Sequence, residues 1–250
     1  MKTTYVYSEE KGVESIDRLI CRDFRVGWYP AREDGMARAL TLLEQIPFLK
    51  LKDGFVLKET CARWFDGKRI FTWAVPEGEE TEEREMVPFD DMFLPVPGML
   101  EQSEGCETPL IGKPKGALPP MEAIEGDDSP ESYLAASLFA RELVDMGGAA
   151  LGRSSMRWMF HNVLLRNIWS DSSMYMSAIG PRECWEIEEI PAVWPPMVVT
   201  SDEWVKVTMH TYMAWRGRAI YEIKDTYRRG SYDLTWESGK LAHRRDRRWS

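Results

Sequence analysis

The first half of the chain alternates between short β-prone runs and one helical repeat. Residues 2–8 alternate in polarity as a strand does, and apolar residues recur at helical spacing over 35–46. Two Asp-Gly pairs, at 53 and 66, then divide the β-prone stretch 48–75, which predicts an antiparallel meander with turns at both pairs. A strand, a helix and a meander predict an α+β half of the ferredoxin-like kind.

The second half predicts two helices and a second meander. Pro130 follows Asp128 and Ser129, either of which would cap a helix that ends at the glycines 147 and 148. Another helical repeat covers 153–169 and predicts a projecting helical segment. The candidate strands after it are 172–180, 184–191, 202–215, 218–227 and 231–236.

The clearest alternation lies in residues 202–215. One face of this strand carries Val205, Val207, Met209, Thr211 and Met213. The other carries Trp204, Lys206, Thr208, His210 and Tyr212.

Charge divides the chain into three segments, which we take as two α+β halves, 1–76 and 129–250, joined by an acidic, Pro-rich connection, 77–128. Residues 77–130 hold 15 Asp or Glu and 3 Lys or Arg, a net charge of −12, within a chain of net charge −9. Residues 216–250 have a net charge of +5. Such asymmetry hints at a basic binding face, although solvated charges would give the same pattern.

Several classes of chemistry lack a signal in the sequence. No run of 18 apolar residues and no signal-peptide pattern is present, so we expect a cytoplasmic protein with no membrane contact. The four cysteines are scattered without metal-binding spacing, and phosphate-loop and dinucleotide fingerprints are missing. We therefore expect no metal and no cofactor.

Arginines recur on the helical repeat after Gly152. Arg153, Arg157 and His161 fall on one stripe, and Arg166 lies further along. Arginine at a helix N-terminus opposes the helix dipole, and a bound phosphate would offset that cost. Ion pairs with acidic residues of the preceding helix would offset it equally well.

Two further groups of cations lie near the chain ends. Arg22, Arg25 and Arg38 stand among aromatic residues, a mixture that suits single-stranded RNA but also an ordinary surface. The last residues contain His243 followed by four arginines, which are Arg244, Arg245, Arg247 and Arg248. This tail could bind nucleic acid, remain solvated or dock onto the acidic segment 77–130 of the same chain.

A weaker signal is the pair Glu222 and Lys224 on a predicted strand. An acidic residue, a spacer and a lysine, with an upstream carboxylate such as Asp202, are found in metal-dependent nucleases. A cross-strand ion pair on an exposed sheet is the commoner explanation.

Taken together, two β-rich halves with arginines early in the chain, on a helix and at the very end resemble the CRISPR RNA-processing endoribonucleases, in particular their type IV branch. The resemblance implies tandem ferredoxin-like halves and RNA cleavage without metal, with the RNA 2′-OH as nucleophile. It also implies that the enzyme remains bound to its product among the other subunits of a ribonucleoprotein complex.

The resemblance also implies residue roles. Arg22, Arg38 and Arg244 or Arg245 would hold the scissile phosphate, and His243 or His210 would carry protons. The residues expected to bind the rest of the RNA are Arg25, Arg153, Arg157, Arg166, Arg244, Arg247 and Arg248. Two alternatives stay open: a non-catalytic subunit of such a complex, and an acidic phage or plasmid protein that mimics nucleic acid.

Overall fold

The computed structural model describes residues 2–7, 38–64, 67–79, 83–88, 110–149, 162–164, 185–189, 191–213 and 219–244. Within these ranges the side chains at 38, 61–64, 67–70, 142, 144–149, 162–164, 212, 213 and 244 are not described. The fold is α+β, dominated by antiparallel strands, as the sequence predicts. The strand orders and contacts given below are those of these residues.

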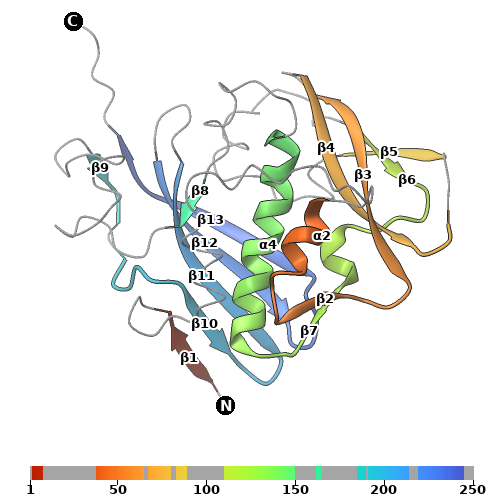
Figure 1. Ribbon diagram of the computed structural model, residues 1–250. Helices are drawn as coiled ribbons and strands as arrows, with labels where there is room; N and C mark the ends of the chain where they lie inside the picture. The colour runs from red at the N-terminus through yellow and green to blue at the C-terminus, as the bar shows by residue number, and fades with distance from the viewer. Residues whose placement is uncertain are drawn as a thin grey trace, which may run out of the picture.

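A seven-stranded antiparallel sheet, called here the large sheet, forms the left side of the molecule (Figure 1). Its strand order is β1-β10-β11-β12-β13-β9, and β8 pairs with β11. The strands are β1 (Thr3–Val6), β8 (Asn162–Leu164), β9 (Trp185–Ile187), β10 (Met197–Thr200), β11 (Trp204–Met213), β12 (Ala219–Arg228) and β13 (Leu234–Arg244).

The remaining elements lie on one side of the large sheet, to its right in Figure 1. They include three two-stranded ribbons, in which β2 pairs with β7, β3 with β4 and β5 with β6. These elements are α2 (Arg38–Leu43), β2 (Leu49–Leu51), β3 (Phe55–Trp64), β4 (Gly67–Pro76), β5 (Arg84–Pro88), β6 (Leu110–Pro114), the 3₁₀ turn η3 (Pro120–Ala123), β7 (Ile124–Gly126) and α4 (Pro130–Ala149).

Helix α4 is the central element, and it starts where the sequence predicts. The Ser129 hydroxyl accepts a hydrogen bond from the Ser132 amide at 3.1 Å, so Ser129 caps the helix and Pro130 takes its first position. The helix contacts β10 and β11 on one side and β4 on the other. It therefore covers one face of the large sheet, as Figure 1 shows.

One hydrophobic core joins the three segments that charge distinguishes. The same cluster contains Leu42 from the first segment, Ile124 from the acidic one, and Tyr133 and Val207 from the last, each fully buried. Val205 and Met209, on the same face of β11 as Val207, are also buried. The core lies between α4 and the large sheet.

Two predicted elements differ from the structure. The predicted helix over 153–169 is wrong at 162–164, which form β8. Strand β10 pairs with β11 only over Val205–Thr208, and β8 takes the same edge of β11 further along, at Thr211–Met213. The backbone N–H and C=O groups on this edge of β11 thereby find hydrogen-bond partners. The predicted strand 172–180 lies outside the described residues.

The first meander and the acidic segment also differ from expectation. Gly54 has a φ of +81°, as the predicted turn requires, but β2 pairs with β7 and not with β3. The composition of the acidic segment predicts an irregular connection, yet its described residues include β5, β6, η3 and β7. Ile111 and Ile124 are buried there, and Ile124 belongs to the core cluster.

Candidate nucleic-acid interface

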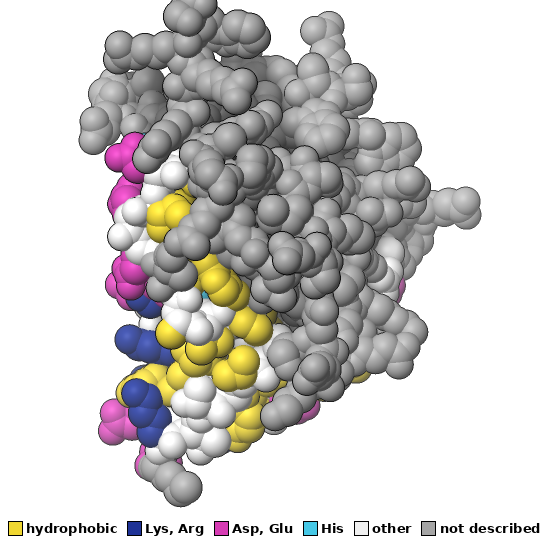
Figure 2. Space-filling model, turned by 90° about the vertical axis from the view of Figure 1, so that its left-hand side faces the viewer, with side chains coloured by type: hydrophobic (Ala, Val, Ile, Leu, Met, Phe, Trp, Pro, Cys, Tyr) yellow, Lys and Arg dark blue, Asp and Glu magenta, His cyan; other side chains and the backbone are white. Residues whose placement is uncertain are grey.

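The face of the large sheet that points away from α4, called here the outer face, carries aromatic and cationic side chains. Register places Trp204 beside Arg228, and Lys206 beside Thr226, which in turn lies beside Thr235. Directly paired residues share a face, and these alternate with the buried Val205 and Tyr227. In Figure 2, Lys or Arg side chains lie along the left edge beside hydrophobic ones, and Asp or Glu side chains are interspersed with them.

Trp204 is the aromatic centre of this surface. Its ring is half-buried, and the ammonium groups of Lys2 and Lys206 each lie 5.7 Å from the ring centroid. Both lysines are exposed. Cations at this distance interact favourably with an indole ring, and they also raise the local positive potential. The outer face therefore carries an indole ring with two ammonium groups over it.

The turn between β10 and β11 fixes the position of Trp204. The Ser201 hydroxyl accepts from the Trp204 amide at 3.0 Å and donates to the Trp204 carbonyl at 2.9 Å. The Ser201 amide also donates to that carbonyl at 2.8 Å. Because the backbone of Trp204 is held by three hydrogen bonds, the ring is presented from a rigid position.

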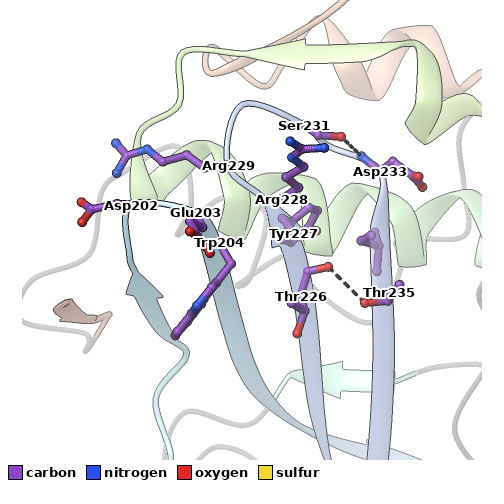
Figure 3. Close-up of a pocket in the computed structure, with 11 residues that line it drawn as sticks. Asp202, Glu203, Trp204, Thr226, Tyr227, Arg228, Arg229, Ser231, Asp233 and Thr235 are labelled. Atoms are coloured by element: carbon purple, nitrogen blue, oxygen red, sulfur yellow. Dashed lines mark hydrogen bonds between the residues drawn. The ribbon is translucent and has the colours of Figure 1, made fainter. Parts of the chain in front are cut away.

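A hollow of about 970 Å³ adjoins Trp204, where β11 and β13 begin and β12 ends (Figure 3). Trp204, Thr226 and Thr235 lie along it in that order across the three strands. Its other polar and charged lining residues are Asp202, Glu203, Arg228, Arg229, Ser231 and Asp233. The volume is of the size that holds a small ligand or one nucleotide unit.

The two arginines of the hollow differ in their contacts. Arg229 donates from Nε to Asp128 at 2.9 Å and from Nη1 to the Ser201 carbonyl at 3.1 Å. Burial alone would raise the pKa of Asp128, but hydrogen bonds from Tyr133 and Arg229 lower it below its ordinary value. Arg228 is exposed and forms no ion pair with any described residue. Arg229 is thus structural, whereas Arg228 has no carboxylate partner among the described residues.

Most residues of the predicted RNA site lie outside the described part of the chain. Arg38 begins α2 and Arg244 ends β13, but only their backbones are described. Whether the cations gather into one site stays a prediction. The residues outside the described ranges are Arg22, Arg25, Arg153, Arg157, Arg166, Arg245, Arg247 and Arg248.

His243, the predicted proton carrier, is described and lies beside two carboxylates. Its Nε2 is 3.4 Å from Glu186, and its Nδ1 is 3.6 Å from Glu188. It pairs with Ala219 at the start of β12, whereas Trp204 pairs with Arg228 at its end. At about 3.3 Å per residue, roughly 30 Å separates the two positions. The structure does not bring His243 to the aromatic centre.

His210, the other candidate proton carrier, is 1% exposed, which does not suit contact with RNA. Its Nδ1 lies 2.9 Å from the Trp194 carbonyl, and its Nε2 is 3.6 Å from a Glu222 carboxylate oxygen. Burial lowers the pKa of His210, and the hydrogen bond to Trp194 and the charge of Glu222 only partly offset this effect. The neutral imidazole is therefore part of the packing of the sheet.

Glu222 and Lys224 form an ion pair with each other on β12. That hydrogen bond raises the pKa of Lys224. Asp202 precedes β11, whose first residue pairs with Arg228, whereas Glu222 pairs with His210. Because about six residues of strand separate these two pairs, Asp202 lies roughly 20 Å from Glu222. The geometry does not match the metal-nuclease arrangement, and the ion pair is a surface contact along one strand.

Sequence reasoning placed Trp204 and Lys206 on one face but did not identify them as a site. The missing partner was Lys2, which reaches Trp204 only because β1 pairs with β10 and β10 with β11. Arg228 joins them through the pairing of β11 with β12. The alternation of 202–215 and 218–227 indicates which side chains of one strand share a face. The strand order then determines which strands bring these side chains together.

Comparison with models of known protein families, with curated proteins and with solved structures finds no match to this chain. Within the described ranges, no group of three or more His, Cys, Asp or Glu side chains is placed to hold a metal ion. Among the same residues, no helix is both long enough and apolar enough to cross a membrane.

Proposed function

We propose that the protein binds RNA, with a single-stranded stretch lying across the outer face of the large sheet. The observation that carries the proposal is Trp204 with the ammonium groups of Lys2 and Lys206 each 5.7 Å from its ring centroid. An aromatic ring offers a stacking surface to a base, and nearby cations pair with the flanking phosphates. Arg228, on the neighbouring strand, adds a third cation without a carboxylate partner among the described residues.

Local charge supports this proposal despite the overall acidity of the chain. The sum of −9 is dominated by residues 77–130, and the described part of that segment packs on the α4 side of the large sheet. Among the described carboxylates of this segment, Glu85 on β5 lies away from the large sheet, whereas Asp128 pairs with Arg229 beside the hollow. Screening over about 8–10 Å at physiological salt limits the repulsion from distant groups.

The finer part of the proposal is that the RNA is a repeat hairpin, cleaved without metal by a ferredoxin-like endoribonuclease of a CRISPR-type complex. This part rests on the resemblance to the CRISPR RNA-processing endoribonucleases and on the arginines expected to hold the phosphate, among them Arg22, Arg38 and Arg245. In that reaction the 2′-oxygen attacks the phosphorus, the 5′-oxygen leaves with a proton, and a 2′,3′-cyclic phosphate remains. Incubation of labelled hairpin RNA in EDTA tests it, and the double change R38A/R245A should abolish cleavage by a folded protein.

RNA binding itself is tested by anisotropy titration of an unstructured, labelled 12-nucleotide RNA at several salt concentrations. K206E should weaken binding and reduce the salt slope by about 0.7 for each phosphate that the protein no longer neutralises. K115E makes the same charge change on the exposed Lys115, which follows β6 on the opposite side of the molecule, and should leave both quantities nearly unchanged.

Two results would contradict RNA binding at this face. Equal weakening by both variants would indicate a response to net charge alone. An intact wild-type protein that binds no RNA at low salt would overturn the proposal and favour the acidic interaction protein.

A further inference from the structure

The edge of the large sheet at β1 is open. The Tyr7 amide donates to the Pro196 carbonyl at 2.9 Å, in the same register that pairs β1 with β10. Backbone hydrogen bonds to one neighbour involve every second residue of an antiparallel strand, so Thr4 and Val6 point their N–H and C=O groups away from β10. These groups have no hydrogen-bond partner among the described residues. A further strand could therefore pair with this edge.

Every residue of β1 is exposed, including Tyr5 at 38% and Val6 at 39%. The strand consists of threonine, tyrosine and valine, which favour β structure, and it contains no charged residue. At the other end of the sheet, the part of the β13 edge that β9 leaves uncovered carries Glu237 and Lys240. Charged side chains on an edge oppose pairing with another chain. The β1 edge lacks this protection.

We propose that the β1 edge binds the β1 edge of a second copy of this chain, antiparallel and with a two-fold axis at Tyr5. Thr4 then lies opposite the partner's Val6, and Val6 opposite the partner's Thr4. These residues carry the outward backbone groups, so each pair exchanges both of its N–H···O=C hydrogen bonds. Tyr5 lies opposite the partner's Tyr5 in a non-hydrogen-bonded pair, where side chains approach most closely, and the two exposed rings cover each other.

Symmetry and charge favour a second copy as the occupant. A two-fold contact uses the β1 edges of both molecules and leaves neither open, so the assembly ends at a dimer. Each chain has a net charge of −9, but β1 is neutral and Lys2 precedes it. The strands β5 and β6 of the acidic segment lie far from β1 (Figure 1). Pairing through β1 therefore keeps these acidic strands of the two molecules apart.

The dimer also joins the two outer faces. Directly paired residues share a face, so both outer faces lie on the same side of the joined sheet. Lys2 precedes β1 and lies 5.7 Å from the Trp204 ring centroid, which places the aromatic centre of each copy two strands from the contact. The pairing itself does not require RNA, so it is tested separately from the proposed function.

Sedimentation equilibrium of the protein without RNA tests the pairing. One short strand buries less surface than a standard interface, so dimers should appear only as the concentration rises toward about 0.5 mM. V6P removes an N–H that points away from β10 and leaves the pairing of β1 with β10 intact. The change affects both symmetric pairs, so dimerisation should weaken roughly fivefold to 150-fold, the range for two lost hydrogen bonds. A wild-type protein that stays monomeric, or V6P that dimerises equally well, would overturn the proposal.

Introduced cysteines test the position of the axis without the proline variant. Y5C places two thiols in a non-hydrogen-bonded pair, whose Cα separation of about 4.5 Å suits a disulfide. T3C is the matched control, because Thr3 is exposed on the same face but would lie roughly 13 Å from the partner's Thr3. Under mild oxidation, Y5C should give a dimer linked at position 5, shown by non-reducing electrophoresis and mass spectrometry, whereas T3C should match the wild-type background. Equal yields from the two variants would indicate random collision and overturn the proposal.

Discussion

The Arg141 guanidinium on α4 holds the fully buried Asp225 carboxylate on β12 with two hydrogen bonds, of 2.6 and 2.7 Å. A third hydrogen bond, of 2.7 Å, joins Arg141 to the Ser137 carbonyl one helical turn earlier. The pair fixes α4 against the core face of the large sheet. Because Asp225 points toward α4, its neighbours on β12 point the other way and belong to the outer face, which also carries the lysines.

Removal of one member of this pair should be costly. D225A leaves the Arg141 guanidinium without its carboxylate and should lower the free energy of unfolding by about 3–5 kcal/mol, measured by chemical denaturation. K224A is the matched control, because Lys224 is the next residue and pairs with Glu222 on the outer face, where it is 42% exposed. That surface pair should contribute less than about 1 kcal/mol. Equal destabilisation by the two changes would show that the buried pair does not anchor α4.

Gly126 lies where a methyl group has no room. A Cβ at this position would overlap the Tyr232 side chain and approach the Phe48 carbonyl oxygen to 2.8 Å. Tyr232 cannot move aside easily, because its hydroxyl contacts Ser132 at 2.6 Å and the Asp128 amide at 3.0 Å. G126A should therefore destabilise the protein by about 1–3 kcal/mol in thermal or chemical denaturation.

Gly239 provides the control for that change. No atom lies within 4 Å of a Cβ built there, so G239A should be neutral or slightly stabilising. If G126A is also neutral, the packing between β7 and the turn that carries Tyr232 is looser than the structure indicates.

Burial of His210 should make stability depend on pH. Its pKa is lowered in the folded protein mainly by burial, so the unfolded chain takes up a proton at higher pH than the folded one does. Stability is then complete above the unfolded value of about 6.5 and is lost as the pH falls from there toward the folded value. The groups that face the imidazole are Glu222, Lys224 and the Trp194 carbonyl.

The measurement is the unfolding midpoint between pH 7.5 and 5. H210Q should flatten the dependence, whereas H243Q, at a half-exposed histidine, should preserve it. A wild-type midpoint that does not fall on acidification would contradict the neutral, buried imidazole.

Periodicity predicted those features that depend on near neighbours in sequence. The faces of β11 follow from the alternation of Val205 and Val207 with Trp204 and Lys206, and the start of α4 follows from Ser129 and Pro130. Pairing between distant segments carries no local signal. The partner of β2 is β7, more than seventy residues later, and β8 occupies a stretch with a helical repeat because an edge of β11 was open.

The candidate site shows the same division. Trp204 and Lys206 were placed on one face by alternation, but Lys2 reaches Trp204 only through the order β1-β10-β11. Arginine clusters were the stronger signal in the sequence, and their spatial arrangement is a property of long-range packing. Charge runs mark where cations are, whereas strand order determines which of them share a surface with an aromatic ring.

The role of Trp204 is tested most directly by the affinity of its variants for unstructured RNA. W204A should weaken binding by about 1–3 kcal/mol, or roughly fivefold to 150-fold, because one stacked base no longer has its platform. W204F keeps an aromatic ring and should retain most of the affinity. If W204A binds RNA as tightly as the wild-type protein, the outer face is not the RNA-binding surface.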